Sequence, residues 1–528
     1  MTRRPDPTSP TPPERPGALP VPTREVELKL LAHPGDLARL AAAPLPGSWS
    51  AGPAETLRQR TTYFDTDGLN LAAHGVALRV RREGKRCVQA VKTLGRGAGE
   101  AAGLAVRREW EWPIAGDAPD LEPLRAGALR EAVPQEALDR LRPVFTTDVR
   151  RTVLRLRPSD GTEIEMALDA GHVTAHPPAG SATAHRAIAE VELELKAGRV
   201  AGLFEVAAAL NRLVPLRLSA RSKADEGFAL LTGRGPAAVR AKPLGLGPAS
   251  TAAECFRQVV RNCLAHLLDN EAAVTAGADP EALREMAAAV RRLEAAFRLF
   301  KGLVRCPRGA GLRKELRWLG RRLEAARAQD RLAQRLALLP ATAVPAVLAA
   351  ALARARRDAR LALLEALHGP RCTALLLGLA GWLEGGEWRR GAALDAPMSA
   401  VVPGLLDRRL AKVRRAAAGL DPADAQARAR LWRRVMRLRY ALDFCRGLFP
   451  PERLRPALDA VDALRAALKP AVDLDQALSL LADCRARPAR AALKALEPRL
   501  RRQLAREAAA LPAALAAFRG MEPFWAAG

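Results

Sequence analysis

The sequence predicts an α+β protein with two domains: an N-terminal closed β-barrel and a C-terminal all-helical bundle. Two observations support this prediction. Charged and apolar residues alternate along successive short runs from residue 24 to about 228, and beyond residue 250 Ala, Leu and Arg recur with helical periodicity. The length of 528 residues also exceeds what a single hydrophobic core usually supports.

The run from Glu25 to Leu30 sets the pattern of the first domain. Successive side chains of a strand point to opposite faces, so Glu25, Glu27 and Lys29 line one face and aliphatic residues line the other. On a single strand, such a charged face is most simply exposed to solvent. The pattern returns in later runs with acids and bases both on the polar face, and a sheet encloses such faces only by closing around water and ligand.

The predicted strands follow one another with short connections. They span residues 24–31, 59–66, 76–82, 87–92, 106–112, 151–157, 162–168 and 188–196, with helical segments at 36–43, 120–142 and 200–213. A segment at 219–228, which carries Lys223, completes the unit. The glycine cluster at 95–99 lacks the G-x-x-x-x-G-K-[ST] spacing of a phosphate-binding loop, so we interpret it as a hairpin connection.

A lumen lined by both carboxylates and basic groups has a limited set of uses. Carboxylates bind hard divalent cations through oxygen. Arg and Lys pair with phosphate oxygens, Arg as a planar fork and Lys as a point charge. Together they predict a metal-dependent phosphoryl-transfer site, in which positioning and charge neutralisation supply most of the catalysis and a bound metal activates the water.

Five motifs in order resemble those of the CYTH superfamily, also called triphosphate tunnel metalloenzymes. They are Glu25-x-Glu27-x-Lys29, Tyr63-Phe64-Asp65-Thr66, Leu78-Arg79-x-Arg81, Arg107-x-Glu109-x-Glu111 and Glu192-x-Glu194. The likeness covers residues 24 to about 232, and residues 143–228 are most similar to the bacterial inorganic triphosphatases. It implies an eight-stranded antiparallel tunnel in which glutamates hold Mg²⁺ or Mn²⁺, basic residues grip a triphosphate, and tripolyphosphate is cleaved to pyrophosphate and phosphate.

The resemblance also implies roles for individual residues. The metal-ligand candidates are Glu25, Glu27, Glu111, Glu165, Glu192 and Glu194. The phosphate-gripping, and hence catalytic, candidates are Lys29, Arg79, Arg81, Lys92, Arg107, Arg151 and Lys223. Glu109 and Glu190 lie on the same strand face as the candidate ligands, but they could support those ligands from behind without contacting the metal. Spacing does not identify the acid that takes the proton from the attacking water.

The second half of the chain has a different character. After a Gly/Pro-rich linker at 233–250, residues 251–525 predict antiparallel helices with short connections, and residues 291–303 align with 436–448 as an internal repeat. These stretches, with 315–323 between them, resemble the CHAD domain, a pseudo-twofold helical module with a basic groove that binds polyphosphate. The histidines typical of that family fall near Arg284 and Ala429, so the chain departs from the family there.

Basic residues on these helices are the candidates for polyphosphate binding. They are Arg291, Arg292, Arg298, Lys301, Arg317, Arg321, Arg322, Arg433, Arg437 and Arg439. For each one taken singly, a solvated helix face is the alternative. The formal net charge of +27, most of it in the second half, predicts polyanionic partners.

Other features predict where the protein works. Residues 1–22 are rich in Pro, Thr and Arg and lack the apolar run of a secretory signal, which predicts a disordered tail and a cytoplasmic protein. The seven cysteines contain no C-x-x-C and predict free thiols in a reducing compartment. Arg residues interrupt every Ala/Leu-rich segment, so no membrane association is expected. His172 and His176 are interpreted as part of a surface loop.

Three alternatives stay open at this point. The barrel could act on thiamine triphosphate, or convert ATP to cyclic AMP, with the same liganding acids. The protein could bind polyphosphate, or associate with polyphosphate granules, without catalysis. The basic half could bind nucleic acid, which is less favoured. The oligomeric state and the preferred metal are left open by the sequence.

Overall fold

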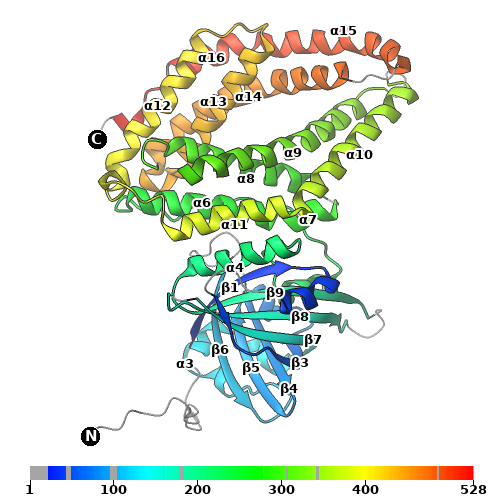
Figure 1. Ribbon diagram of the computed structural model, residues 1–528. Coiled ribbons are helices and arrows are strands. Elements are labelled where there is room, and N and C mark those ends of the chain that lie inside the picture. The colour runs from blue at the N-terminus through cyan, green and yellow to red at the C-terminus, as the bar shows by residue number, and fades with distance from the viewer. Residues whose placement is uncertain are drawn as a thin grey trace.

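The computed structural model describes residues 22–42, 49–94, 104–158, 160–177, 183–277, 279–304, 307–340, 344–483 and 487–526. The N-terminal half forms a barrel, and the C-terminal half forms a helical domain stacked against one side of it (Figure 1). The glycine cluster at 95–99, nearly all of the predicted tail at 1–22, Cys306 and Cys484 lie outside the described residues.

Eight strands close the barrel, and each neighbouring pair is antiparallel. In order around the cylinder they are β1 (Thr23–Leu31), β6 (Leu104–Ile114), β5 (Arg86–Thr93), β4 (Val76–Glu83), β3 (Glu55–Asp65), β7 (Arg142–Arg157), β8 (Glu163–Ala175) and β9 (His185–Ala197). Strand β9 pairs back onto β1, which closes the sheet. Two short strands are added to it, β2 (Ser50–Ala51) on β7 and β10 (Arg217–Ser219) on β1. The predicted eight-stranded antiparallel tunnel is therefore confirmed.

The apolar face of the barrel strands points outward and is covered. Leu28 and Leu30 of β1 are fully buried against helix α4 (Val200–Leu213), which lies between the barrel and the helical domain (Figure 1). On the other side, Trp110 of β6 packs in a second cluster with Leu71 and Leu124. Helices α1 (Leu37–Ala41), α2 (Asn70–Ala73) and α3 (Gly127–Ala132) and several single 3₁₀ turns connect the strands.

Two further elements complete the barrel wall. Helix α5 (Lys223–Thr232) begins with a capping box in which Ser222 and Asp225 satisfy each other's backbone N–H groups. Gly171 of β8 lies so close to β7 that an added Cβ atom would come within 2.0 Å of the Asp148 carbonyl oxygen. Only glycine fits there, since any side chain would push the two strands apart.

The helical domain contains α6 (Ala252–Asp269), α7 (Glu271–Ala276), α8 (Pro280–Leu299), α9 (Pro307–Ala337), α10 (Ala346–His368), α11 (Pro370–Gly385), α12 (Met398–Ala418), α13 (Ala425–Phe444), α14 (Pro451–Ala482), α15 (Arg487–Ala509) and α16 (Leu511–Arg519). The internal repeat corresponds to α8 and α13, each 20 residues long. Asp279 caps the first and Asp424 caps the second in the same way. The predicted helical domain is thus confirmed.

The two domains share one apolar core. Phe204 of α4 and Trp382 of α11 belong to the same cluster of buried residues. Polar contacts flank it: Asn211 Nδ2 donates to the Pro370 carbonyl at 2.9 Å, and Arg217 pairs with Glu271 at 3.5 Å. The barrel and the helical domain are therefore packed as continuously as two layers of one domain.

Two smaller predictions can be compared with the structure. The described cysteines, Cys87, Cys255, Cys263, Cys372 and Cys445, are free and buried, as predicted. Among the described helices, none has a stretch apolar enough to cross a bilayer.

Candidate functional site

A cavity of about 960 Å³ lies inside the barrel. All the residues predicted as metal ligands or phosphate-gripping groups line it, and they come from seven strands and from α5. The period-2 alternation produces this arrangement, because it directs every second side chain of each strand into the lumen. The structure thus brings the predicted residues together, while their individual roles stay predictions.

Several lining residues were not predicted to grip phosphate or hold metal. Gln59, Thr61 and Tyr63 of β3 face the lumen, as do Glu109 and Lys196. The alternation of β3 could have identified the first three, but their neutral side chains carried no charge signal. Among the residues that the structure describes, ten Lys and Arg side chains and seven Glu side chains line the cavity. The excess of positive charge favours an anionic ligand.

Three glutamates form a row across neighbouring strands. Glu194 of β9 lies directly opposite Glu165 of β8 and, on its other side, directly opposite Glu27 of β1. Like charges facing each other across a sheet are destabilising. Burial and the nearby Glu192 raise the pKa of Glu27 to about 7, and burial also raises the pKa of Glu194 despite Lys196. Lys196 pairs with Glu194 at 2.6 Å, and Lys29 lies 3.9 Å from Glu27. Clustered carboxylate oxygens such as these suit Mg²⁺ or Mn²⁺.

The flanking acids each have one basic partner. Glu25 pairs with Lys92 at 2.9 Å, and Glu111 pairs with Arg81 at 2.8 Å. These partners are phosphate-gripping candidates that face the same lumen. A bound polyanion could draw the cations toward itself and leave the carboxylates for a metal.

Glu192 has a different environment. Its carboxylate accepts from Lys29 Nζ at 2.5 Å, Arg151 Nη2 at 2.5 Å and Lys223 Nζ at 2.8 Å. Burial alone would raise the pKa of Glu192, but Lys223 and Lys29 hold it well below its usual range. Glu192 is therefore the most strongly paired of the predicted metal ligands.

Two partly buried arginines of the lumen have buried N–H donors without a described acceptor. Arg79 Nη2 donates to Glu109 at 3.1 Å. Burial alone would lower the pKa of Arg79, but Tyr63 and Glu109 together raise it above its usual value. The Nε atoms of Arg79 and Arg107 are buried and have no hydrogen-bond partner among the described residues. Buried donors without an acceptor are uncommon in folded proteins. Phosphate oxygens are the acceptors that match them.

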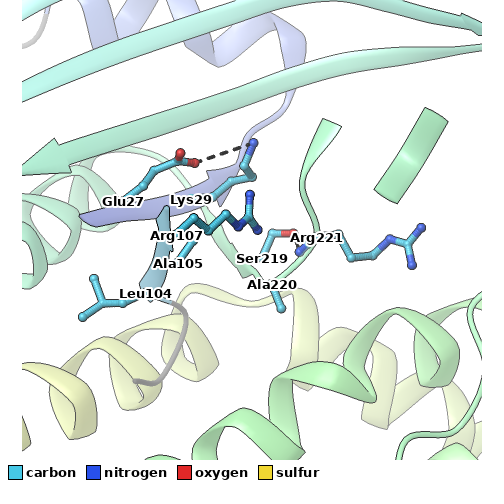
Figure 2. Close-up of a pocket in the computed structure, with 8 residues that line it drawn as sticks. All are labelled: Glu27, Lys29, Leu104, Ala105, Arg107, Ser219, Ala220 and Arg221. Atoms are coloured by element: carbon cyan, nitrogen blue, oxygen red, sulfur yellow. Dashed lines mark hydrogen bonds and ion pairs between the residues drawn. The ribbon is translucent and has the colours of Figure 1, made fainter. Parts of the chain in front are cut away.

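A small crevice interrupts the wall next to this site. It lies along β1 between the start of β6 and the end of β10, and its volume of about 10 Å³ suits a single water molecule. Figure 2 shows Glu27, Lys29 and Arg107 gathered on one side of it, with the Arg221 side chain pointing away. Arg221 is held in that direction by Glu226.

A second cavity, of about 510 Å³, lies in the helical domain. Its lining consists of basic residues from α8, α12 and α13: Arg298, Arg409, Lys412, Arg415, Arg434 and Arg437. Burial and the neighbouring Arg298 lower the pKa of Arg437 to about 10, and burial and Arg409 lower that of Lys412. Mutual repulsion of this kind marks a cluster in which positive charges outnumber acids, although Glu294 offsets part of it at Arg437.

The structure divides the basic residues that the sequence singled out in this domain. Arg298 and Arg437 line the cavity, and Arg433 and Lys301 lie close enough to lower the pKa values of Arg437 and Lys412. The others do not line it. Arg291 pairs with Glu324, Arg292 is buried beside Asn262, Arg439 pairs with Asp462, and Arg317, Arg321 and Arg322 are exposed on α9. Sequence reasoning missed α12, although its basic residues recur at helical spacing between 408 and 415.

Comparison with known proteins gives two family matches. The family model of the CYTH domain matches residues 23–228, and that of the CHAD domain matches residues 258–482. The chain is 32% identical over 171 residues to an inorganic triphosphatase of Haemophilus influenzae, a match covering 32% of this chain and 45% of that protein. The chain thus spans less than half the length of this curated relative.

Solved structures are also similar. The CHAD domain of the plant Ricinus communis is 31% identical, with 54% of this chain and 97% of that chain covered and a TM-score of 0.49. PptA of Streptomyces chartreusis is 22% identical, with 51% of this chain and 98% of that chain covered and a TM-score of 0.38.

Proposed function

Because the chain belongs to the CYTH family through residues 23–228 and to the CHAD family through residues 258–482, we propose that its barrel hydrolyses inorganic triphosphate and its helical domain binds polyphosphate. The observation that carries the first part is the lumen, where carboxylates in register on neighbouring strands share one cavity with arginines that have unpaired N–H donors. The similar Haemophilus protein, itself an inorganic triphosphatase, supports the same reaction.

The carboxylate row would hold the metal. Glu27, Glu194 and Glu165, with Glu25 beside them on β1, offer oxygen ligands from three neighbouring strands. A bound Mg²⁺ or Mn²⁺ would neutralise charge on the triphosphate and lower the pKa of a bound water.

The basic residues would bind and orient the phosphate chain. Arg79, Arg107 and Lys92 face the lumen from three adjacent strands, so they can contact oxygens of successive phosphates. In the reaction, water adds to a terminal phosphorus and the bond to the bridging oxygen breaks. Pyrophosphate leaves with the electron pair, and fixed positive charge beside it stabilises the charge that develops there.

Phosphate release tests this assignment. Tripolyphosphate, ATP, thiamine triphosphate and long-chain polyphosphate are compared with Mg²⁺ and with Mn²⁺, and cyclic AMP formation is followed for ATP. We expect metal-dependent turnover of tripolyphosphate, and a loss of at least 10²-fold in kcat/KM when Glu27→Gln and Glu194→Gln are combined. Glu205→Gln, on the outer helix α4, is the matched control. Retention of polyphosphate without any turnover would instead identify a binding protein.

The basic cavity of the helical domain supports the second part of the proposal. Its described lining consists of six Lys and Arg side chains and includes no acid. Such a surface binds phosphate chains through charge, so affinity should fall steeply with salt.

A pair of double variants tests this cavity. Arg409→Gln with Lys412→Gln removes two charges from its lining and should weaken binding of long-chain polyphosphate at least tenfold. Arg321→Gln with Arg322→Gln removes two exposed charges from α9 and should change it less than twofold. Equal losses in both would assign binding to overall charge. DNA or RNA that polyphosphate cannot displace would point to a nucleic-acid site.

A further inference from the structure

Behind the tunnel lining lie two carboxylates that do not themselves line the cavity. Asp169 of β8 is 0% exposed and Glu190 of β9 is 6% exposed. They are direct cross-strand partners, and Asp169 is also the partner of Arg151 on β7. Two like charges in this arrangement repel each other unless cations lie between them.

Three basic side chains provide that compensation. Asp169 accepts from Arg151 Nε at 2.8 Å and Nη2 at 2.6 Å, and it pairs with Lys223 Nζ at 2.7 Å. Glu190 accepts from Lys29 Nζ at 2.8 Å and also contacts Lys223. The charges therefore alternate along a chain from Arg151 through Asp169, Lys223 and Glu190 to Lys29.

The oxygens of Asp169, Glu190 and Glu192 lie within 4.8 Å of one another, a spacing that would also suit a metal ion. Their contacts favour another role. Each carboxylate is already paired with at least two cations from different elements, so a divalent ion would have to displace them. Only Glu192 of the three lines the cavity.

The three cations, in contrast, all face the lumen. Lys29, Arg151 and Lys223 line the cavity and come from three different elements, β1, β7 and α5. A bidentate contact through Nε and Nη2 fixes the plane of the Arg151 guanidinium and leaves its Nη1 edge for another acceptor. Fixing these donors before the ligand arrives lowers the entropy lost on binding.

We propose that Asp169, assisted by Glu190, is a positioning residue that presets Arg151, Lys223 and Lys29 for the phosphate chain without touching it. This inference rests on the proposed function of the lumen as a triphosphate site. Asp169 acts only through the cations, so its loss should weaken anion binding more than it slows the chemical step. The expected signature is a KM effect.

The test compares two equally buried carboxylates of the barrel. Asp169→Asn keeps the shape but removes the charge that holds Arg151 and Lys223. Asp65→Asn is the matched control, because Asp65 is also 0% exposed but its described hydrogen-bond donors are the backbone N–H groups of Thr66, Leu71 and Ala72. Binding of tripolyphosphate is measured by calorimetry in EDTA, alongside steady-state kinetics with Mn²⁺ and thermal unfolding.

For Asp169→Asn we expect a 10- to 100-fold weaker Kd and a comparable rise in KM, with kcat reduced less than fivefold. For Asp65→Asn both constants should stay within twofold of the wild type. Binding by Asp169→Asn within twofold of the wild type overturns the proposal, and so do equal losses in both variants. If Asp169→Asn does not fold, Glu190→Gln replaces it with the same expectations.

The calorimetric arm separates this inference from the proposed function. A wild type that binds tripolyphosphate more tightly than Asp169→Asn but does not hydrolyse it would overturn the triphosphatase assignment and keep the positioning role. Hydrolysis by the wild type, with Kd and KM unchanged in Asp169→Asn, would keep the triphosphatase assignment and overturn the positioning role.

Discussion

At the residue scale, Glu27 is the side chain whose charge state is most sensitive to its surroundings. It faces Glu194 in register and lies near Glu25 and Glu192, and burial is the largest cause that raises its pKa from 4.5 to about 7. An acid whose pKa is higher in the folded state stabilises the fold while it is protonated. That contribution is complete below pH 4.5 and is lost as the pH rises through about 7.

The raised pKa of Glu27 leads to a prediction for the metal-free protein. At pH 8, Glu27→Gln should be more stable than the wild type by roughly 1 to 3 kcal/mol, because glutamine cannot ionise. At pH 5 the difference should be several times smaller. Thermal unfolding in EDTA at both pH values measures it, with Glu205→Gln as the control. A difference that does not change between pH 5 and pH 8 would contradict the assignment of Glu27 as a strained carboxylate.

Adding metal should make the wild type more stable than Glu27→Gln, the opposite of the order without metal. At pH 8, Mn²⁺ should raise the unfolding temperature of the wild type, since a ligand that binds only the folded state stabilises it. Glu27→Gln lacks one ligand and should gain much less. Unfolding scans over a series of Mn²⁺ concentrations measure the effect. Equal stabilisation of both proteins would place the metal elsewhere.

At the element scale, α12 brings its basic residues against α8 and α13 at a cost in stability. Burial and Arg298 lower the pKa of Arg437 to about 10, so its positive charge is disfavoured in the folded state at neutral pH. Arg437→Gln should therefore weaken polyphosphate binding and at the same time raise the free energy of unfolding by about 1 kcal/mol, a figure reduced for partial exposure. Filter binding and thermal unfolding of the same preparation measure both effects. A loss of both affinity and stability would assign Arg437 a structural role.

The elements differ in how far the sequence could predict them. Alternation of Glu25, Glu27 and Lys29 and of later runs predicted the closed barrel and placed the charged residues in its lumen. Strand β7, which begins at Arg142, is longer than the predicted 151–157. In its first half the polar residues Thr146, Thr147 and Asp148 follow one another, which breaks the alternation, and this part pairs with β3 and β8.

The basic cavity of the helical domain could not be predicted from the sequence. Each helix of the second domain was predictable from its own periodicity, but the cavity needs three helices to meet. Contacts between α8, α12 and α13 depend on packing across more than a hundred residues, which spacing within one helix does not report. The same reason explains why Asp169 was not singled out, since its partners lie on β7 and α5.

At the scale of the whole molecule, the shared core should make the two domains unfold together. Helix α11 lies so close to α4 that a Cβ atom added at Gly381 would come within 3.0 Å of the Phe204 Cβ. Gly381→Val should force the helices apart and lower the unfolding temperature by several degrees or split the transition in two. Gly311→Val, on α9 with open space around it, is the control. Calorimetry distinguishes one transition from two, and an unchanged single transition would contradict the coupling.

The closure of β9 onto β1 has a consequence for longer substrates. A complete cylinder offers entry only through its ends, so a linear polymer must thread into it tip first. Any trimming of such a polymer would then proceed from a terminus, and a large ring of phosphates, which has no tip to insert, would be spared.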